Sequence, residues 1–299
     1  MGKLYVVLLT LSLIWGTSFL FIKLLVDPLG AWGVVFWRCF FGTVILVVIV
    51  TIRKEWGSSK KLPFMMIIIV SLLNNAIPWV LIALSETQIS SSYASLINAT
   101  TPIWTVIIGS IFFFQKLGWI QWFGISLGFI GIVILTDVQL VNLFNQSFIG
   151  LFTMLGATIC YGLSTHLSKK YLKGISITMI SVSTLLVSTI ISFFVVLVSN
   201  PSTFSKVMDP SIFLALIGLG VFGSGFAYIL YYYLIQEGSP DFAALVTYLV
   251  PISAMLWGSL FLNEKISFMM IIGFFIILSG VYFSSKKTKV PELEKRATA

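Results

Sequence analysis

Apolar runs of about twenty residues, separated by short polar stretches with Gly, Pro or Asn, follow one another along the whole chain. An α-helix needs roughly 20 apolar residues to cross the hydrocarbon core of a membrane, whereas a barrel strand needs about ten alternating ones. The unbroken runs therefore predict membrane-spanning helices rather than strands. The first five are expected at Leu4–Leu25, Ala31–Ile52, Pro63–Leu84, Ser91–Phe114 and Trp119–Thr136. The second five are expected at Phe148–Ser168, Ile177–Val198, Ser211–Leu234, Phe242–Leu262 and Ile266–Ser284.

The composition supports the same fold class, an all-α membrane protein with ten transmembrane helices. Hydrophobic residues make up 58% of the chain and charged residues 9%, against roughly 25% charged in a soluble domain. The connections between the runs are too short to contain a soluble domain. Any functional site is therefore expected inside the helix bundle.

The net charge of +8 is explained by membrane topology rather than by nucleic-acid binding. The basic residues lie in short connections, and Lys and Arg resist translocation across the membrane. With the N-terminus inside, 14 of the 18 lysines and arginines fall on the cytoplasmic side, and Lys23 and Arg38 lie within helices, leaving Lys206 and Lys265 outside. The sequence thus predicts a multi-pass protein of the inner or plasma membrane with both termini cytoplasmic.

The second half of the chain repeats the first. A constant offset of 149 residues aligns Pro102-Ile103 with Pro251-Ile252, Lys116 with Lys265, and Gly124 and Gly131 with Gly273 and Gly280. We expect a first repeat at residues 1–137, a second at 138–285 and a polar cytoplasmic tail at 286–299. Because five helices is an odd number, the second repeat would enter the membrane from the opposite side. Such inverted repeats are a recurrent transporter architecture, although a duplication can also serve stable packing alone.

The chain resembles the EamA family of the drug/metabolite transporter superfamily along nearly its whole length. The resemblance rests on Trp15-Gly16-x-Ser18 followed by Lys23, on Arg38, and on a small-residue helix with a central Pro in each half. In each half a Gly-rich helix then follows, after Gln115-Lys116 and after Glu264-Lys265. The resemblance implies a ten-helix secondary carrier, and many family members export amino acids and other small metabolites. Gln115 departs from the family, which often has an acidic residue there.

Polar side chains inside membrane helices are costly, so they mark candidate pathway positions. In the fourth predicted helix, Asn98 and Thr101 share one face with other small residues, although such residues also serve close helix packing. In the third predicted helix, Asn74-Asn75 precede Pro78, which leaves a backbone carbonyl one turn earlier without its hydrogen bond. A broken polar helix of this kind is typical of transporter binding sites. The alternative is a kink that serves packing. The candidate pathway residues are Trp15, Ser18, Asn74, Asn75, Asn98, Thr101, Tyr161, Ser164, Ser224, Tyr228 and Thr247.

Three other features have a functional and a structural interpretation. Arg38 could be a charge partner for a substrate carboxylate, or it could reach the outer interface in a structural role. His166 is expected in packing or at an interface rather than in proton coupling, and Tyr231 is expected in an interfacial aromatic belt. Cys39 and Cys160 lie within apolar segments and are expected to be inert packing residues.

Other function classes find less support. No G-x-x-x-x-G-K-[ST] motif is present, which argues against an ATP-driven pump. The ten acidic residues are expected at helix ends and in loops rather than at mid-membrane. Neither an intramembrane enzyme nor a proton relay is therefore indicated. We also expect no metal and no cofactor. A membrane scaffold or assembly protein without transport is the alternative. The prediction is a secondary or facilitative exporter of small metabolites such as amino acids, in which two halves alternate around a central cavity, as a monomer or homodimer in the lipid bilayer.

The predicted topology is tested by reporter fusions at Ser58 and Asn142. A reporter that is active only outside the cytoplasm should be silent at Ser58, in the first basic connection, and active at Asn142, between the repeats. The reverse pattern would overturn the assignment of sides.

Overall fold

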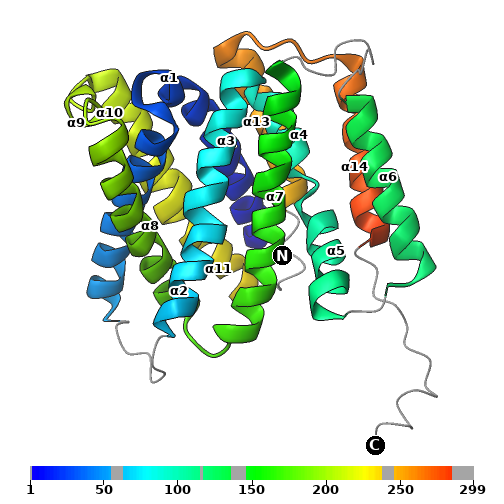
Figure 1. The fold of residues 1–299 in the computed structure, drawn as a ribbon, viewed down its shortest axis with the longest axis horizontal. Helices are drawn as coiled ribbons and strands as arrows, with labels where there is room; N and C mark the ends of the chain where they lie inside the picture. The colour runs from blue at the N-terminus through cyan, green and yellow to red at the C-terminus, as the bar shows by residue number, and fades with distance from the viewer. Residues whose placement is uncertain (1, 55–62, 115–116, 136–145, 238–245, 285–299) are drawn as a thin grey trace, which may run out of the picture.

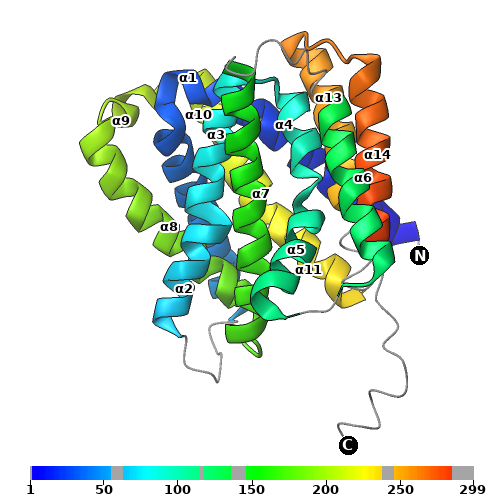
Figure 2. The same ribbon diagram turned by 45° about the vertical axis from the view of Figure 1, so that its right-hand side comes forward.

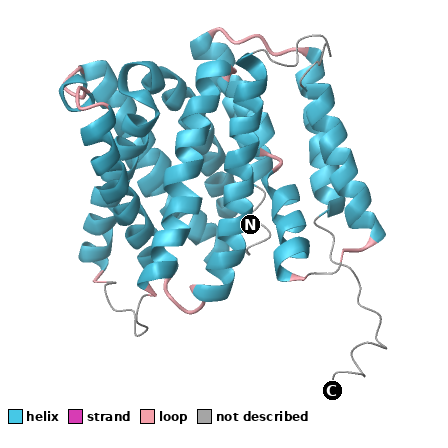
Figure 3. Cartoon of the chain, in the orientation of Figure 1, coloured by secondary structure: helices cyan, strands magenta, loops and turns pink. Residues whose placement is uncertain are grey.

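The computed structural model describes residues 2–54, 63–114, 117–135, 146–237 and 246–284. All regular structure in these ranges is helical, and no strand occurs in them (Figure 3). The predicted repeat boundary at 137/138, the polar tail 286–299 and Gln115 lie outside the described residues.

The first helix, α1 (Gly2–Arg53), comprises two arms that were predicted as separate helices. It contains Pro28, and its backbone leaves the helical region at Gly30, with φ of 70° and ψ of 163°. A positive φ is strained for residues with a Cβ but not for glycine. The carbonyl of Leu29, left free by this turn, accepts hydrogen bonds from Asn200 Nδ2 at 3.0 Å and Thr203 Oγ1 at 3.1 Å. The turn is therefore fixed by residues from the second half of the chain.

The rest of the first half consists of α2 (Phe64–Ser71), a π-helix η1 (Leu72–Ala76), α3 (Ile77–Gln88), α4 (Ser91–Asn98), α5 (Thr101–Phe113) and α6 (Trp119–Leu135). The fourth predicted helix is thus divided between α4 and α5. The division falls just before Pro102, which cannot continue the backbone hydrogen bonding of α4.

The second half consists of α7 (Gln146–Tyr171), α8 (Ile177–Ser199), a short helix α9 (Thr203–Lys206), α10 (Pro210–Leu216), a π-helix η3 (Ile217–Phe226), α11 (Ala227–Glu237), α13 (Val246–Leu262) and α14 (Phe268–Ser284). Six of the described helical segments are long and apolar enough to cross a membrane, with α1 counted once, and three more are apolar but shorter. The two arms of α1 and the elements of both halves pack side by side in Figures 1 and 2.

Helices α6 and α14 stand together at one end of the molecule and pack through glycines (Figure 1). A Cβ on Gly280 would lie 2.5 Å from the main-chain nitrogen of Gly128, and a Cβ on Gly131 would lie 3.0 Å from the carbonyl oxygen of Gly273. Because residue numbers rise along one helix as they fall along the other, the two run antiparallel. Gly131 and Gly280 are equivalent under the 149-residue offset, and so are Gly124 and Gly273. The contact of Gly124 with Gly280 and the contact of Gly131 with Gly273 are therefore related by a local pseudo-twofold axis.

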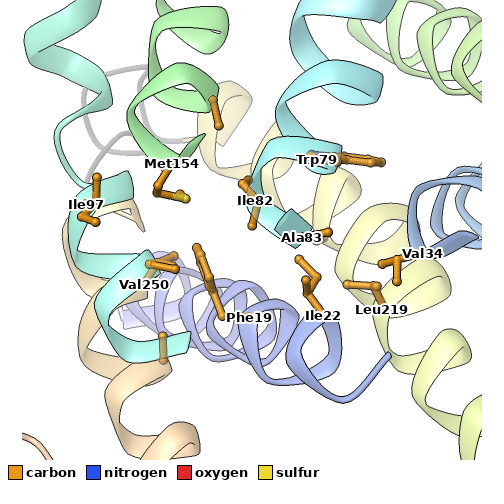
Figure 4. Packing of buried hydrophobic residues seen from close by; sticks show 14 of the residues in the cluster. Phe19, Ile22, Val34, Trp79, Ile82, Ala83, Ile97, Met154, Leu219 and Val250 are labelled. Carbon is orange, nitrogen blue, oxygen red and sulfur yellow. The ribbon is translucent and has the colours of Figure 1, made fainter. Parts of the chain in front are cut away.

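One apolar cluster forms the interior, and most of its buried residues come from α1, α3, α4, α7, α13 and α14. Phe19 and Ile22 of α1 lie near Ile82 and Ala83 of α3 and near Val250 of α13 (Figure 4). The first arm of α1 therefore lies between the two halves, where its buried face helps to shape the site described below.

The glycine contact between α6 and α14 leads to a prediction about stability. Gly280→Val would force the two backbones apart, and such overpacking costs about 1–3 kcal/mol. The variant should unfold at a lower temperature in detergent, as measured by loss of the monodisperse size-exclusion peak after heating. Ser279→Val, at the neighbouring exposed position, is the matched control and should behave as the unchanged protein. Equal melting of both variants would contradict the close backbone contact.

Candidate binding cavity

A cavity of about 360 Å³ lies between the two halves of the chain. Its walls come from both arms of α1, from η1, α3, α4, α5 and α7, and from η3, α11 and α13. The lining residues are Trp15, Ser18, Phe19, Ile22, Arg38, Asn74, Trp79, Ile82, Asn98, Thr101, Tyr161, Gly223, Tyr228, Tyr231, Thr247 and Val250. The volume is in the range of pockets that hold small molecules.

The cavity wall follows the internal repeat. Five pairs of lining residues are each separated by the same 149 residues that relate the two halves: Asn74 and Gly223, Trp79 and Tyr228, Ile82 and Tyr231, Asn98 and Thr247, and Thr101 and Val250. Equivalent backbone positions of both repeats therefore face one central space.

The π-helices explain how two lining residues that are five positions apart in the chain can lie on the same face of their helix. In an α-helix two residues five apart point in different directions, but in a π-helix they lie one turn apart. The π-helix η1 covers Asn74 and brings it into line with Trp79, and η3 does the same for Gly223 and Tyr228. Widened turns at equivalent places in both halves thus shape the cavity, and π-helical turns are frequent at functional sites.

The two halves contribute different chemistry to this symmetric frame. The first half supplies Arg38, Asn74, Asn98 and Thr101, together with Ser18. The second half supplies mainly the surfaces of aromatic and small residues, at Tyr161, Gly223, Tyr228, Tyr231 and Val250. The cation and both amides of the lining therefore come from the first half, while aromatic and apolar surface comes from both halves.

Arg38 is 7% exposed. Its Nε donates a hydrogen bond to Ser224 Oγ at 3.0 Å, and its guanidinium carbon lies 3.8 Å from the ring centroid of Trp79. In the part of the chain that the structure describes, no carboxylate forms an ion pair with Arg38 and its terminal nitrogens donate to no protein group. The stacking and the serine fix the guanidinium plane, which leaves its outer edge able to bind an anionic group in a bidentate manner.

The side-chain amide of Asn74 is held by hydrogen bonds to two residues that do not line the cavity. Its Nδ2 donates to Asn75 Oδ1 at 3.1 Å, and its Oδ1 accepts a hydrogen bond from Ser164 Oγ at 3.2 Å. Asn75 and Ser164 are themselves buried. The position of the Asn74 amide is therefore set by a contact between η1 of the first half and α7 of the second.

Two buried polar atoms of lining residues have no hydrogen-bond partner among the described residues: Ser18 Oγ and Asn98 Oδ1. Buried polar atoms are nearly always hydrogen-bonded, and an unsatisfied one calls for an explanation. Both residues line the cavity, while the two oxygen atoms themselves are covered by protein in this conformation. Ser18 Oγ also requires the glycine opposite it, since a Cβ on Gly223 would lie 2.8 Å away.

The structure brings together nine of the twelve residues singled out from the sequence. Three others contact lining residues from outside the cavity: Asn75 and Ser164 lie behind Asn74, and Ser224 binds Arg38. The nine that line it are Trp15, Ser18, Arg38, Asn74, Asn98, Thr101, Tyr161, Tyr228 and Thr247.

Sequence reasoning missed Trp79 and placed Tyr231 in an interfacial belt, whereas both line the cavity. Tyr231 lies three residues after Tyr228 and so shares its helix face, and its ring centroid is 5.4 Å from that of Trp15. Trp79 could have been found by carrying the 149-residue offset from Tyr228 back into the first half. The other missed lining residues are Phe19, Ile22, Ile82, Gly223 and Val250.

His166 and the cysteines take structural positions. His166 Nε2 lies 2.8 Å from the carbonyl oxygen of Thr105, and its ring stacks on Phe113 with centroids 4.7 Å apart. Cys39 is buried, Cys160 is half-buried, and neither forms a disulfide. Among the described residues no group of three or more His, Cys, Asp or Glu side chains is arranged to hold a metal ion.

Glu86 departs from the expectation that the acidic residues avoid the interior. It does lie near the end of a helix, two residues before α3 ends at Gln88, but its side chain is fully buried. The end of α3 is covered there by α1 and α7, because Lys23 of α1 donates to the carbonyl of Glu86 and Ser85 donates to the carbonyl of Gly150. A hydropathy pattern does not reveal this burial, because one acid at the edge of an apolar run looks the same whether it is covered or not.

Comparison with known proteins identifies the family. The EamA-like transporter family matches the chain twice, over residues 2–137 and 148–286. The protein therefore belongs to the EamA-like transporter family, whose two-repeat fold fits the all-helical structure, and it is an integral membrane protein.

Full-length relatives agree with this assignment. An uncharacterized transporter of Archaeoglobus fulgidus is 24% identical over 288 residues, covering 95% of this chain and 99% of the relative. The uncharacterized transporter YoaV of Bacillus subtilis is 23% identical, with 95% and 97% covered, and the uncharacterized inner membrane transporter YedA of Escherichia coli is 26% identical, with 88% and 84% covered. A solved crystal structure matches with a TM-score of 0.65 at 15% identity, covering 95% of this chain and 97% of that one, which indicates a shared fold.

Proposed function

We propose that the protein is a secondary or facilitative carrier that exports small metabolites, such as amino acids, by alternating access around the cavity between its repeats. The observation that carries the proposal is the cavity itself, which lies at the seam of the halves and is lined by equivalent positions of both. A scaffold or assembly protein has no need for a buried space that contains an unpaired cation and unsatisfied amide and hydroxyl groups.

The proposal includes ten membrane spans in two inverted sets of five. The two arms of α1 count as two spans, and the shorter apolar helices α6, α13 and α14 count as three. Antiparallel packing of the equivalent helices α6 and α14 supports the inversion, because the last spans of two inverted repeats must point in opposite directions. Such halves can exchange conformations and open a central site to either side in turn. In this arrangement both termini lie in the cytoplasm.

The chemistry of the cavity indicates an amphipathic solute with a carboxylate. The outer edge of the Arg38 guanidinium would take the carboxylate, and Asn98 Oδ1 would accept a hydrogen bond from an amino group. The aromatic wall formed by Trp15, Tyr228 and Tyr231 would cover an apolar side chain. An amino acid combines these three features.

Proteoliposome counterflow tests the proposal. The purified protein should exchange some members of a set of radiolabelled amino acids across the membrane, and the corresponding amino acid amides should exchange at least about tenfold more slowly, because they offer Arg38 no negative charge. Absence of saturable exchange for every amino acid and amide would favour the scaffold alternative.

The cavity residues themselves are tested by Asn74→Leu and Asn98→Leu. Both variants should insert and remain monodisperse but lose the exchange, because each removes an amide from the solute path while keeping a side chain of similar size. Thr10→Leu, at an exposed position on α1, is the matched control and should exchange at the original rate. Unchanged rates in both asparagine variants would remove the cavity from the transport path.

A further inference from the structure

Glu86 is a buried acid whose side chain has no partner. It is 0% exposed, and neither of its carboxyl oxygens forms a hydrogen bond within the described part of the chain. An ionised carboxylate buried without a partner is far more costly than a neutral polar group. The arrangement therefore fits a carboxyl group that holds a proton in this conformation.

The nearest cation is engaged elsewhere. Lys23 Nζ donates hydrogen bonds to two main-chain carbonyl oxygens at the end of α3, that of Glu86 and that of Ile89, the second at 3.1 Å. The last carbonyls of a helix lack partners within it, and a cation there is favourable. Lys23 thus connects α1 to the end of α3 through main-chain carbonyls and leaves the Glu86 carboxyl group unpaired. Of the charged groups that act on Glu86, Lys23 has the largest effect.

Both carboxylate oxygens of Glu264, the second acid of this region, accept hydrogen bonds. Glu264 Oε1 accepts a hydrogen bond from the main-chain N–H of Ser91 at 2.7 Å, and Oε2 accepts from the N–H of Ser92 at 2.9 Å and from its hydroxyl at 2.5 Å. It caps the first turn of α4, where a negative charge is favoured. The charged groups that act on Glu86 are Lys23 and Arg38 of α1 and Glu264 beyond α13. Glu264 is thus held by three hydrogen bonds, whereas the carboxyl group of Glu86 accepts none from the described residues.

This cluster adjoins the cavity. Ile22, next to Lys23, and Ile82, one turn before Glu86 on α3, both line it. Lys23 and Glu264 together hold the turn between α3 and α4 to the first arm of α1 and to the second half of the chain. The position equivalent to Glu86 in the second half is Ile235, so the acid occurs in one half only.

We propose that Glu86 is a proton-binding site, and that release of its proton draws Lys23 away from the two carbonyls and onto the carboxylate. The O–H bond of the neutral carboxyl group breaks, its electron pair stays on the carboxylate, and the proton leaves to water. The freed carbonyls of Glu86 and Ile89 loosen the turn between α3 and α4 from α1. Resting on the proposed transport function, this makes the proton the coupling ion of the carrier, with its site beside the solute cavity.

Infrared titration of the protein in liposomes tests the site without any solute. The unchanged protein should show the carbonyl stretch of a buried protonated carboxylic acid, and this band should disappear at alkaline pH. Glu86→Gln, which closely resembles the neutral acid in shape, should lack the band, whereas Glu237→Gln, at an exposed acid at the end of α11, should retain it. A band that persists in Glu86→Gln, or the absence of any such band in the unchanged protein, would overturn the proposal.

A second arm tests the coupling, with a mixture of radiolabelled amino acids as the probe in proteoliposomes. A pH gradient should drive accumulation by the unchanged protein and by Glu237→Gln, while Glu86→Gln should keep exchange without a gradient and lose the gradient-driven accumulation. An equal response of Glu86→Gln and the unchanged protein to the gradient, or no response in either, contradicts coupling at Glu86. If the unchanged protein exchanges none of the mixture, the proposed transport of amino acids is contradicted, while the infrared titration still decides whether Glu86 binds a proton.

Discussion

A polar or charged side chain inside a bundle surrounded by lipid must find a partner within the protein, and this constraint organises the molecule. Several buried polar groups meet it by bonding to a neighbouring helix: Ser85 donates to the carbonyl of Gly150, and Ser253 donates to that of Ser12. Arg38, Asn98 and Glu86 do not find a complete set of partners among the described residues. These three lie at or beside one cavity, where a solute, water or a proton would complete them, whereas Trp37, whose Nε1 also lacks a partner, does not line it.

The two halves share a backbone plan but differ in side chains, and this difference accounts for the character of the site. Equivalent π-helices and equivalent helix faces build a symmetric space, which suits a structure that exchanges two mirrored conformations. Gly223 and Val250 stand in the second half at the positions of Asn74 and Thr101, so these two polar groups line the space from the first half alone. In the proposed carrier, the shared backbone plan would serve the exchange of conformations, and the differing side chains would select the solute.

Much of this could be predicted from the sequence. Helix positions followed from apolar runs, because each run must be about as long as the membrane is thick, and the 149-residue offset identified the repeat. Nine residues that line the cavity could be singled out from the sequence, because polar groups are costly in lipid and because the family resemblance pointed to some of them. The place of Trp79 and Tyr231 in the cavity lining was not predicted, because aromatic residues are equally expected in packing and at interfaces. A π-helical turn also changes which residues share a helix face. The burial of Glu86 depends on contacts of this end of α3 with α1 and α7, which are distant in sequence, and no local pattern encodes them.

The central claim is that one cavity between the halves opens to each side of the membrane in turn. It is tested most directly by a single cysteine at Thr247 of the cavity wall, in a protein whose Cys39 and Cys160 have been replaced by alanine. Accessibility is measured with a membrane-impermeant thiol reagent applied separately to right-side-out and inside-out vesicles. The account predicts labelling from both sides, and slower labelling in the presence of a transported amino acid. Labelling from one side only, at a rate that no solute changes, would contradict it.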